Sequence, residues 1–226
     1  MPTLVLLESP AKCKKIGDIL KSLGHDVVVK ASYGHITDLD KKKLSVDVSN
    51  NFKPQYIISH DKKQVVSDLK TYYKKYNKIL LGCDFDREGE AIAWHVSEQL
   101  KVPKVERKRM LFTEITKGAL EKAFNNPVDL DMNMFYAQQA RRIIDRLIGY
   151  KITPILWANI QNSMKKDVSL SAGRVQSVVN KLVCEREAEI NKFSTSSYYK
   201  TTGKFSNLKN KTKINAELHQ RIVDKD

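Results

Sequence analysis

The 226-residue sequence has few cysteines and no long apolar run. Cys13, Cys83 and Cys184 are widely separated, so neither a disulfide framework nor a zinc site is indicated, and a reducing compartment is expected. No apolar run approaches the length of a membrane span, and the N-terminus carries no recognisable targeting segment. Internal repeats and low-complexity segments are also missing. These absences indicate a soluble, globular protein that does not contact a membrane.

Acidic residues are scarce relative to basic ones. The chain has 26 Asp and Glu against 40 Lys and Arg, a net charge of +14, and this excess favours a polyanionic partner through counterion release. Nucleic acid is the leading candidate, although lysine runs such as Lys41 to Lys43 are also compatible with an ordinary solvated surface. A hydrophobic content of 41% is enough for one large packed domain or two small ones.

The most informative stretch begins with an apolar run at Ile79 to Leu81. Three acids follow at alternating positions, Asp84, Asp86 and Glu88, and then a helical pattern begins, which predicts a strand, an acidic turn and a helix. In an extended segment Asp84 and Asp86 project to the same side, an arrangement that suits a hard divalent cation such as Mg²⁺. The alternative is an acid-rich loop before a capped helix, since Glu88 alone is explained by the helix dipole.

A second acid follows the first predicted strand. Thr3 to Leu7 is a continuous apolar run, Glu8 comes directly after it, and Pro10 suits the first turn of the next helix. Open α/β sheets place their ligand crevices at the carboxyl ends of strands, so the acidic ends of two strands are expected to meet in one cleft. The expected order is β-α-β, an insertion, then α-β-α.

The second half of the chain is expected to be mainly helical. Thr116 is expected to cap a helix, the Asn125-Asn126-Pro127 run marks a domain boundary, and a long helix is predicted to end at Gly149. Arg141 and Asp145 share a face of that helix and can pair. Further on, Arg174, Gln176 and Ser177 supply donors at the start of a helix, where anions are favoured. Tyr198 to Phe205 and Lys213 to Leu218 are predicted to be paired strands.

Several of these stretches together resemble the motifs of the type IA DNA topoisomerases. The matching segments lie in the family's order and are Leu7 to Lys12, Gly34 to Leu39, Asp84 to His95, Phe112 to Thr116, Ala140 to Tyr150 and Ser171 to Ser177. The resemblance implies an α/β Toprim domain, with a mostly parallel sheet flanked by helices, in residues 1–125. It also implies a mainly helical DNA-binding domain in residues 126–194 and the first strands of a β-rich arch in residues 195–226.

The same resemblance implies roles for individual residues. Glu8 corresponds to a catalytic acid, Lys12 assists at the scissile phosphate, and Arg141 binds a backbone phosphate with Asp145 as its partner. The implied Mg²⁺ ligands are Asp84, Asp86 and Glu88. The implied DNA-binding residues are His35, Arg141, Arg174, Gln176 and Ser177.

The implied activity is relaxation of negatively supercoiled DNA without ATP or another nucleotide cofactor. Such enzymes cut one strand, pass DNA through the gap and rejoin the ends through a 5′-phosphotyrosine. The partner is single-stranded or negatively supercoiled DNA, the enzyme is expected to be a monomer, and the location is cytoplasmic. The nucleoid, or the cytoplasmic site of DNA replication if the protein is viral, is the expected place.

One element of the family pattern is missing. The family cleaves DNA with a tyrosine in a Y-x-R-T pattern, and none of the nine tyrosines here fits it. We therefore expect an N-terminal part of the enzyme that supplies the Mg²⁺ site and part of the single-strand site but is inactive alone in relaxation. The start at Met1 is expected to exclude a reverse gyrase. A Toprim-fold primase or nuclease and a non-catalytic DNA-binding module remain the alternatives.

Overall fold

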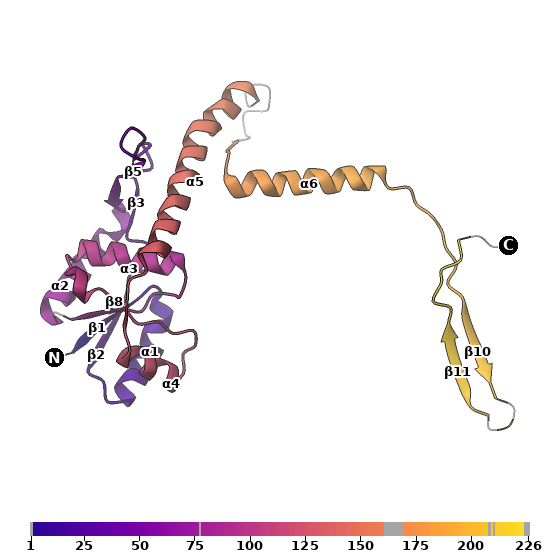
Figure 1. Cartoon of the computed structure of the whole chain (residues 1–226), viewed down its shortest axis with the longest axis horizontal. Coiled ribbons are helices and arrows are strands. Elements are labelled where there is room, and N and C mark those ends of the chain that lie inside the picture. The colour runs from indigo at the N-terminus through magenta and orange to yellow at the C-terminus, as the bar shows by residue number, and fades with distance from the viewer. Residues whose placement is uncertain (1, 77, 161–169, 208, 210, 224–226) are drawn as a thin grey trace. The chain divides into compact units, whose positions relative to one another are not determined.

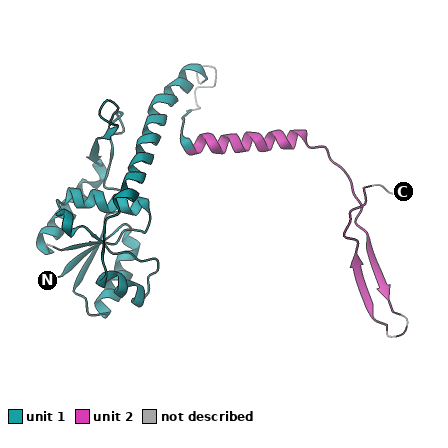
Figure 2. Ribbon diagram, in the orientation of Figure 1, with its two compact units in different colours: residues 1–174 teal, residues 175–226 magenta. Residues whose placement is uncertain are grey.

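The computed structural model describes residues 2–76, 78–160, 170–207, 209 and 211–223 in two compact units. The first unit comprises residues 1–174 and the second residues 175–226 (Figure 2). The domain boundaries predicted after residues 125 and 194 remain predictions. No helix in the described ranges is long and apolar enough to cross a membrane.

A five-stranded sheet forms the centre of the first unit. Its strands are β1 (Thr3–Leu7), β2 (Val27–Ala31), β7 (Ile79–Leu81), β8 (Lys108–Arg109) and β9 (Val128–Asp129), in the order β2-β1-β7-β8-β9. Strands β2, β1, β7 and β8 run parallel to one another, and β9 at the edge runs antiparallel to β8. All five residues of β1 are buried, as expected for a strand covered on both faces. The predicted α/β class with a mostly parallel sheet is confirmed.

Helices cover both faces of this sheet (Figure 1). On one face Val5 and Leu7 pack with α1 (Pro10–Ser22) and α4 (Lys117–Asn125). On the other face Leu4 and Leu6 pack with α2 (Lys63–Tyr76) and α3 (Arg87–Gln99). Successive side chains of a strand point to opposite faces, so the uninterrupted apolar run of β1 supplies both cores. Thr116 caps α4 as predicted, accepting a hydrogen bond from the Ala119 amide at 3.3 Å.

The predicted insertion between β2 and α2 consists of two short antiparallel ladders. One pairs β3 (Thr37–Leu39) with β6 (Tyr56–Ile58), and the other pairs β4 (Val46–Asp47) with β5 (Lys53–Pro54). Two 3₁₀ turns, η1 (His60–Lys62) and η2 (Lys104–Glu106), precede α2 and β8. The insertion places β3 beside the long helix that follows the sheet (Figure 1).

The long helix α5 (Met132–Asn159) does not end at Gly149, so that sequence prediction is wrong. Asp131 caps its start by accepting from the Asn133 amide at 2.9 Å, and the helix continues through Pro154. Glycine favours a helix stop only when the chain takes a left-handed conformation there, and Gly149 stays helical. The ten residues 150–159 are thus also helical.

The second unit contains one helix and one hairpin. Helix α6 (Arg174–Lys192) starts at the last residue of the first unit, and β10 (Thr202–Ser206) pairs antiparallel with β11 (Lys213–Glu217). The predicted pairing of strands in this region is confirmed. None of the described residues from 175 onward is buried, in contrast to the filled core of the first unit.

Candidate active site

The acidic ends of two adjacent strands meet in the first unit, as the sequence predicted. Glu8 follows β1, Asp84 follows β7, and these strands pair through Leu6 and Leu81. Burial, together with the negative charges of Asp84 and Asp86, raises the pKa of the Glu8 carboxyl above its ordinary value. A carboxyl group in this setting is a better proton donor near neutral pH than a free one.

Lys12 supplies the positive charge of this acidic cluster. It lies in the first turn of α1, and its Nζ is 2.6 Å from Asp84 Oδ1. Both side chains are partly exposed, so the pair adds little to stability. The contact holds the ammonium group beside the three carboxylates of Glu8, Asp84 and Asp86, where it can also meet an incoming phosphate.

The acidic turn leads directly into α3, and the expected projection of Asp84 and Asp86 to the same side stays a prediction. Asp86 is the N-cap of α3, and its Oδ1 accepts a hydrogen bond from the Gly89 amide at 2.7 Å. A Cβ atom on Gly89 would lie 2.1 Å from the carbonyl oxygen of Asp84. Only glycine therefore allows α3 to begin so close to the backbone of Asp84.

A buried ion pair supports the acidic turn, and no local sequence pattern predicts it. Arg109 is fully buried on β8, and its Nε is 2.9 Å from Glu90 Oε2. The same guanidinium donates to the carbonyl oxygens of Leu81 and Asp84, each at 2.9 Å. Glu90 also accepts from the Asp131 amide at 2.8 Å. The pair thus connects the acidic turn to the start of α5.

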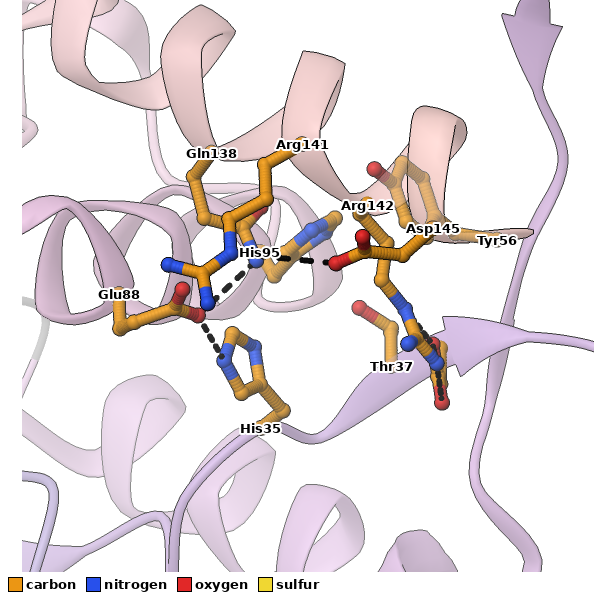
Figure 3. Close-up of a pocket in the computed structure, with 10 residues that line it drawn as sticks. His35, Thr37, Tyr56, Glu88, His95, Gln138, Arg141, Arg142 and Asp145 are labelled. Carbon is orange, nitrogen blue, oxygen red and sulfur yellow. Dashed lines mark hydrogen bonds and ion pairs between the residues drawn. The ribbon is translucent and has the colours of Figure 1, made fainter. Parts of the chain in front are cut away.

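Glu88 lines a pocket beside α5. Its Oε2 accepts from Gln138 Nε2 at 3.0 Å and lies 3.2 Å from His35 Nε2 (Figure 3). The pocket has a volume of about 380 Å³. Its lining comes from β3, β6, α3, α5 and the loop before β3, and consists of His35, Thr37, Asp38, Tyr56, Glu88, His95, Gln138, Arg141, Arg142 and Asp145.

Arg141 and Asp145 lie together on α5, as their spacing predicted. Arg141 Nε is 3.8 Å from Asp145 Oδ2, a long contact between side chains that are each about one third exposed. Arg174 makes the shorter contact, with its Nε 3.0 Å from Asp145 Oδ1. Gln176 and Ser177 lie in the first turn of α6, within the second unit.

Other polar residues of the same helix hold the insertion in place. Arg142 Nη2 lies 2.6 Å from each carboxylate oxygen of Asp38. Arg146 donates to three backbone carbonyls of residues 39–43, and the Tyr150 hydroxyl donates to a fourth. A bidentate arginine–carboxylate pair fixes the relative orientation of the two groups in addition to pairing their charges. Sequence reasoning assigned chemistry to Arg141 and Asp145 and missed that the remaining polar residues of this stretch orient β3.

His95 packs among aromatic residues and also lines the pocket. Its ring lies 4.4 Å from the ring of Tyr56, 5.0 Å from Trp94 and 5.9 Å from Phe135. Burial lowers the pKa of His95 to about 4, so the imidazole is neutral at physiological pH. One wall of the pocket is therefore aromatic and uncharged.

The donor set around Glu8, Asp84 and Asp86 fits a hard divalent cation. These are carboxylate oxygens, the ligands that Mg²⁺ prefers, and a cation would offset the burial and the repulsion from Asp84 and Asp86 that together raise the pKa of Glu8. Within the described ranges, no group of three or more His, Cys, Asp or Glu side chains is already arranged to hold a metal. The three-ligand site of Asp84, Asp86 and Glu88 thus stays a prediction.

Comparisons with known proteins agree with this arrangement. Residues 3–115 match the family model of the Toprim domain, and residues 129–226 match that of DNA topoisomerase. A solved structure of full-length topoisomerase I from Thermotoga maritima is similar, with a TM-score of 0.79 and 39% sequence identity. The match covers 99% of this chain and 36% of that enzyme, so the chain spans about a third of its length. The chain belongs to the type IA DNA topoisomerase family.

Proposed function

We propose that this chain forms the acidic and cationic part of a DNA breaking and rejoining site. The whole enzyme would relax negatively supercoiled DNA without ATP through single-strand cleavage, strand passage and rejoining. The observation that carries the proposal is the meeting of Glu8, Lys12 and Asp84 at two adjacent strand ends. Type IA membership makes DNA the substrate class, and the net charge of +14 supports it.

Glu8 would act as the proton donor in cleavage. A tyrosine hydroxyl attacks a phosphodiester, the bond from phosphorus to the 3′-oxygen breaks, and the phosphate stays on tyrosine through its 5′ side. The departing 3′-oxygen needs a proton, and the raised pKa of Glu8 favours a carboxyl that can give one. Lys12 would stabilise the negative charge on the phosphate. Rejoining would follow the same steps in reverse.

Asp84 and Asp86 would hold Mg²⁺, with Glu88 as the third residue of the predicted set. When bound, the ion supplies positive charge for the rejoining step. Lys12 would shift its contact from Asp84 toward the DNA phosphate when the cation takes up the carboxylate. The predicted nucleophilic tyrosine lies outside these residues, since no tyrosine in the sequence has the family's Y-x-R-T pattern.

Within the first unit, the single strand would run along α5. His35, Arg141 and Arg174 offer donors to backbone phosphates, and Asp145 orients the two arginines. Gln176 and Ser177 would add donors in the first turn of α6, where backbone amides also favour anions. Phosphate contacts of this kind position a strand without reading its sequence.

A plasmid assay tests the proposal. The 226-residue chain is incubated with negatively supercoiled plasmid and Mg²⁺, and binding to a labelled single-stranded oligonucleotide is measured in parallel. The expected result is binding without relaxation. Relaxed product would contradict the placement of the nucleophile outside this chain, and nicked circles would favour the nuclease alternative.

A calorimetric titration with Mg²⁺ tests the metal site separately. The double variant Asp84→Asn, Asp86→Asn should lose most of the affinity, because two carboxylate ligands become neutral amides. Asp61→Asn is the matched control, since Asp61 is an exposed carboxylate on the η1 turn. Equal Mg²⁺ affinity in the double variant and the control would remove Asp84 and Asp86 from the site.

A further inference from the structure

Gln138 is a buried amide on α5 that contacts Glu88 in the first turn of α3. The residue is 7% exposed, and its Nε2 donates to Glu88 Oε2 at 3.0 Å. His35, from the loop before β3, lies with its Nε2 3.2 Å from the same oxygen. Figure 3 shows both side chains reaching the Glu88 carboxylate. Two elements that are distant along the chain therefore hold this one carboxylate group.

The packing of α5 on α3 has a separate source. The Phe135 ring stacks on the Trp94 ring with the centroids 4.2 Å apart, and Phe135 is 2% exposed. Burial of such an aromatic ring stabilises the contact between the helices, whereas burial of an amide costs free energy unless the amide is hydrogen-bonded. The hydrogen bond of Gln138 goes to Glu88. The amide thus serves the position of the carboxylate more than the packing of the helix.

Glu88 differs from the other two carboxylates of the pocket in the charge of its partners. Asp38 is bound by the guanidinium of Arg142, and Asp145 contacts that of Arg141. A guanidinium neutralises the carboxylate that it holds, whereas an amide donates a hydrogen bond and leaves the negative charge in place. A carboxylate that is to bind a cation needs a partner of the second kind.

Gln138 and His35 engage the same oxygen of Glu88, Oε2. Within the described part of the chain, these contacts leave Oε1 as the oxygen available to a cation. Carboxylates that bind metal ions are themselves hydrogen-bonded by neighbouring groups, which fix their orientation. The amide of Gln138 is such a group.

We propose that Gln138 is a positioning residue that orients Glu88 as a ligand of the Mg²⁺ ion. The inference rests on the proposed function, because it starts from the Mg²⁺ set of Asp84, Asp86 and Glu88. Gln138 acts through the carboxylate and makes no contact with the ion itself. Removal of its amide leaves the three acids in place and frees Glu88 to take other rotamers.

Calorimetric titration with Mg²⁺ tests this role on the 226-residue chain. Gln138→Met keeps the length of the side chain and removes the amide, so the Kd for Mg²⁺ should rise about ten-fold. Gln138→Asn keeps an amide but is shorter by one methylene group. It should lose as much affinity, because its donor no longer reaches Oε2. A wild-type Kd in both variants would overturn the proposal.

Gln64→Met is the matched control. Gln64 Nε2 donates to Asp68 Oδ1 at 2.8 Å on α2, so this variant also breaks a bond from a glutamine amide to a carboxylate. Gln64 does not line the pocket. The Kd for Mg²⁺ should equal that of the wild type, and a ten-fold rise here as well would overturn the specific role of Gln138.

A double-mutant cycle with Glu88→Gln separates positioning from a structural role. In a chain that already carries Glu88→Gln, Gln138→Met should weaken Mg²⁺ binding no further, because the ligand through which it acts is gone. A purely structural role would give the same loss with and without Glu88→Gln. It would also lower the melting temperature, measured by circular dichroism without Mg²⁺, and this pair of results would overturn the proposal.

The same titrations distinguish this inference from the proposed function. Suppose that the double variant Asp84→Asn, Asp86→Asn loses Mg²⁺ binding while Glu88→Gln and Gln138→Met bind as the wild type does. The role of Gln138 would then be overturned, and the site of Asp84 and Asp86 would stand. Unchanged affinity in the double variant would overturn both.

Discussion

The two compact units of this chain differ in how they use their apolar residues. In the first unit, Leu4, Leu6 and Leu81 are fully buried between helices and sheet. In the second, Val178, Leu182 and Val183 of α6 are each more than half exposed, although they have the same apolar character. Burial of apolar area is the main favourable term in folding, so the first unit gains more folding free energy from it than the second.

The candidate catalytic residues lie in the better packed of the two units. Side chains that must be held in fixed positions lie on the well-packed unit: Glu8 and Asp84 follow buried strands, and Lys12 lies in the first turn of α1. Gln176 and Ser177 lie on a helix with no buried residue in the range that the structure describes. Substitutions in matched pairs, one in each unit, should therefore have unequal effects.

The largest expected difference concerns two glycines. In Gly89→Ala the added Cβ would lie 2.1 Å from the backbone oxygen of Asp84, which cannot move without opening the acidic turn. We expect a loss of more than about 4 kcal/mol in the free energy of unfolding, measured by urea denaturation. Mg²⁺ binding should be lost with it, because the turn positions the carboxylates.

Gly203→Ala is its counterpart in the second unit. The added Cβ would meet the Phe205 ring at 2.7 Å, but that side chain is 62% exposed and can rotate away. A change within about 0.5 kcal/mol is expected. Equal and large losses in both variants would show that the hairpin is as tightly constrained as the acidic turn.

Two ion pairs give the next contrast. Glu90→Gln leaves Arg109 as a buried charge without its partner, so the free energy of unfolding should fall by about 3–5 kcal/mol. Glu189→Gln breaks the exposed pair with Arg186 on α6 and should cost less than about 1 kcal/mol. Chemical denaturation followed by circular dichroism measures both. A loss below 1 kcal/mol for Glu90→Gln would contradict the supporting role given to the buried pair.

The acid sensitivity of the fold should depend on His95. Its folded-state pKa of about 4 lies below the ordinary value of 6.5, so the unfolded chain binds a proton that the folded chain does not. This contribution is complete above pH 6.5 and is lost as the pH falls toward 4, at about 1.4 kcal/mol per pH unit. Stability curves for His95→Gln should be flatter over this window. His219→Gln, in the exposed unit, should leave the slope unchanged, and an equal slope in all three proteins would refute the assignment.

Much of this fold follows from local pattern. A parallel sheet is predicted by three local features: the apolar run of β1, the proline at the start of α1 and the acids after β7. In such a sheet the carboxyl ends of the strands lie at one edge, so the acids that follow β1 and β7 are expected to lie together. Thr116 predicts the start of α4 by the same local logic. The end of α5 could not be predicted, since a glycine can remain helical where the preceding residues are anchored by long-range contacts such as that of Arg146.

The residues of the candidate site likewise divide into those that the local sequence predicts and those that it does not. Asp84 and Asp86 are marked by sequence because they are acids at a strand end, whereas Arg109 looks like any surface arginine until the sheet buries it. Glu88 has the correct spacing for a metal ligand, but its direction depends on His35 and Gln138, which are distant along the chain. Partners separated by 50 residues or more leave no local pattern.

The smallest expected effect comes from a pair of leucines, one in each unit. Leu182→Ala on α6 removes a side chain that is 59% exposed, and alanine is the better helix former, so the free energy of unfolding should change by less than about 0.5 kcal/mol. Leu120→Ala on α4 removes a side chain that is 0% exposed and should cost about 2–5 kcal/mol through the cavity it leaves. A cost for Leu182→Ala close to that of Leu120→Ala would mean that α6 is packed in solution. The second unit would then be as well suited as the first to hold Gln176 and Ser177 in fixed positions for DNA.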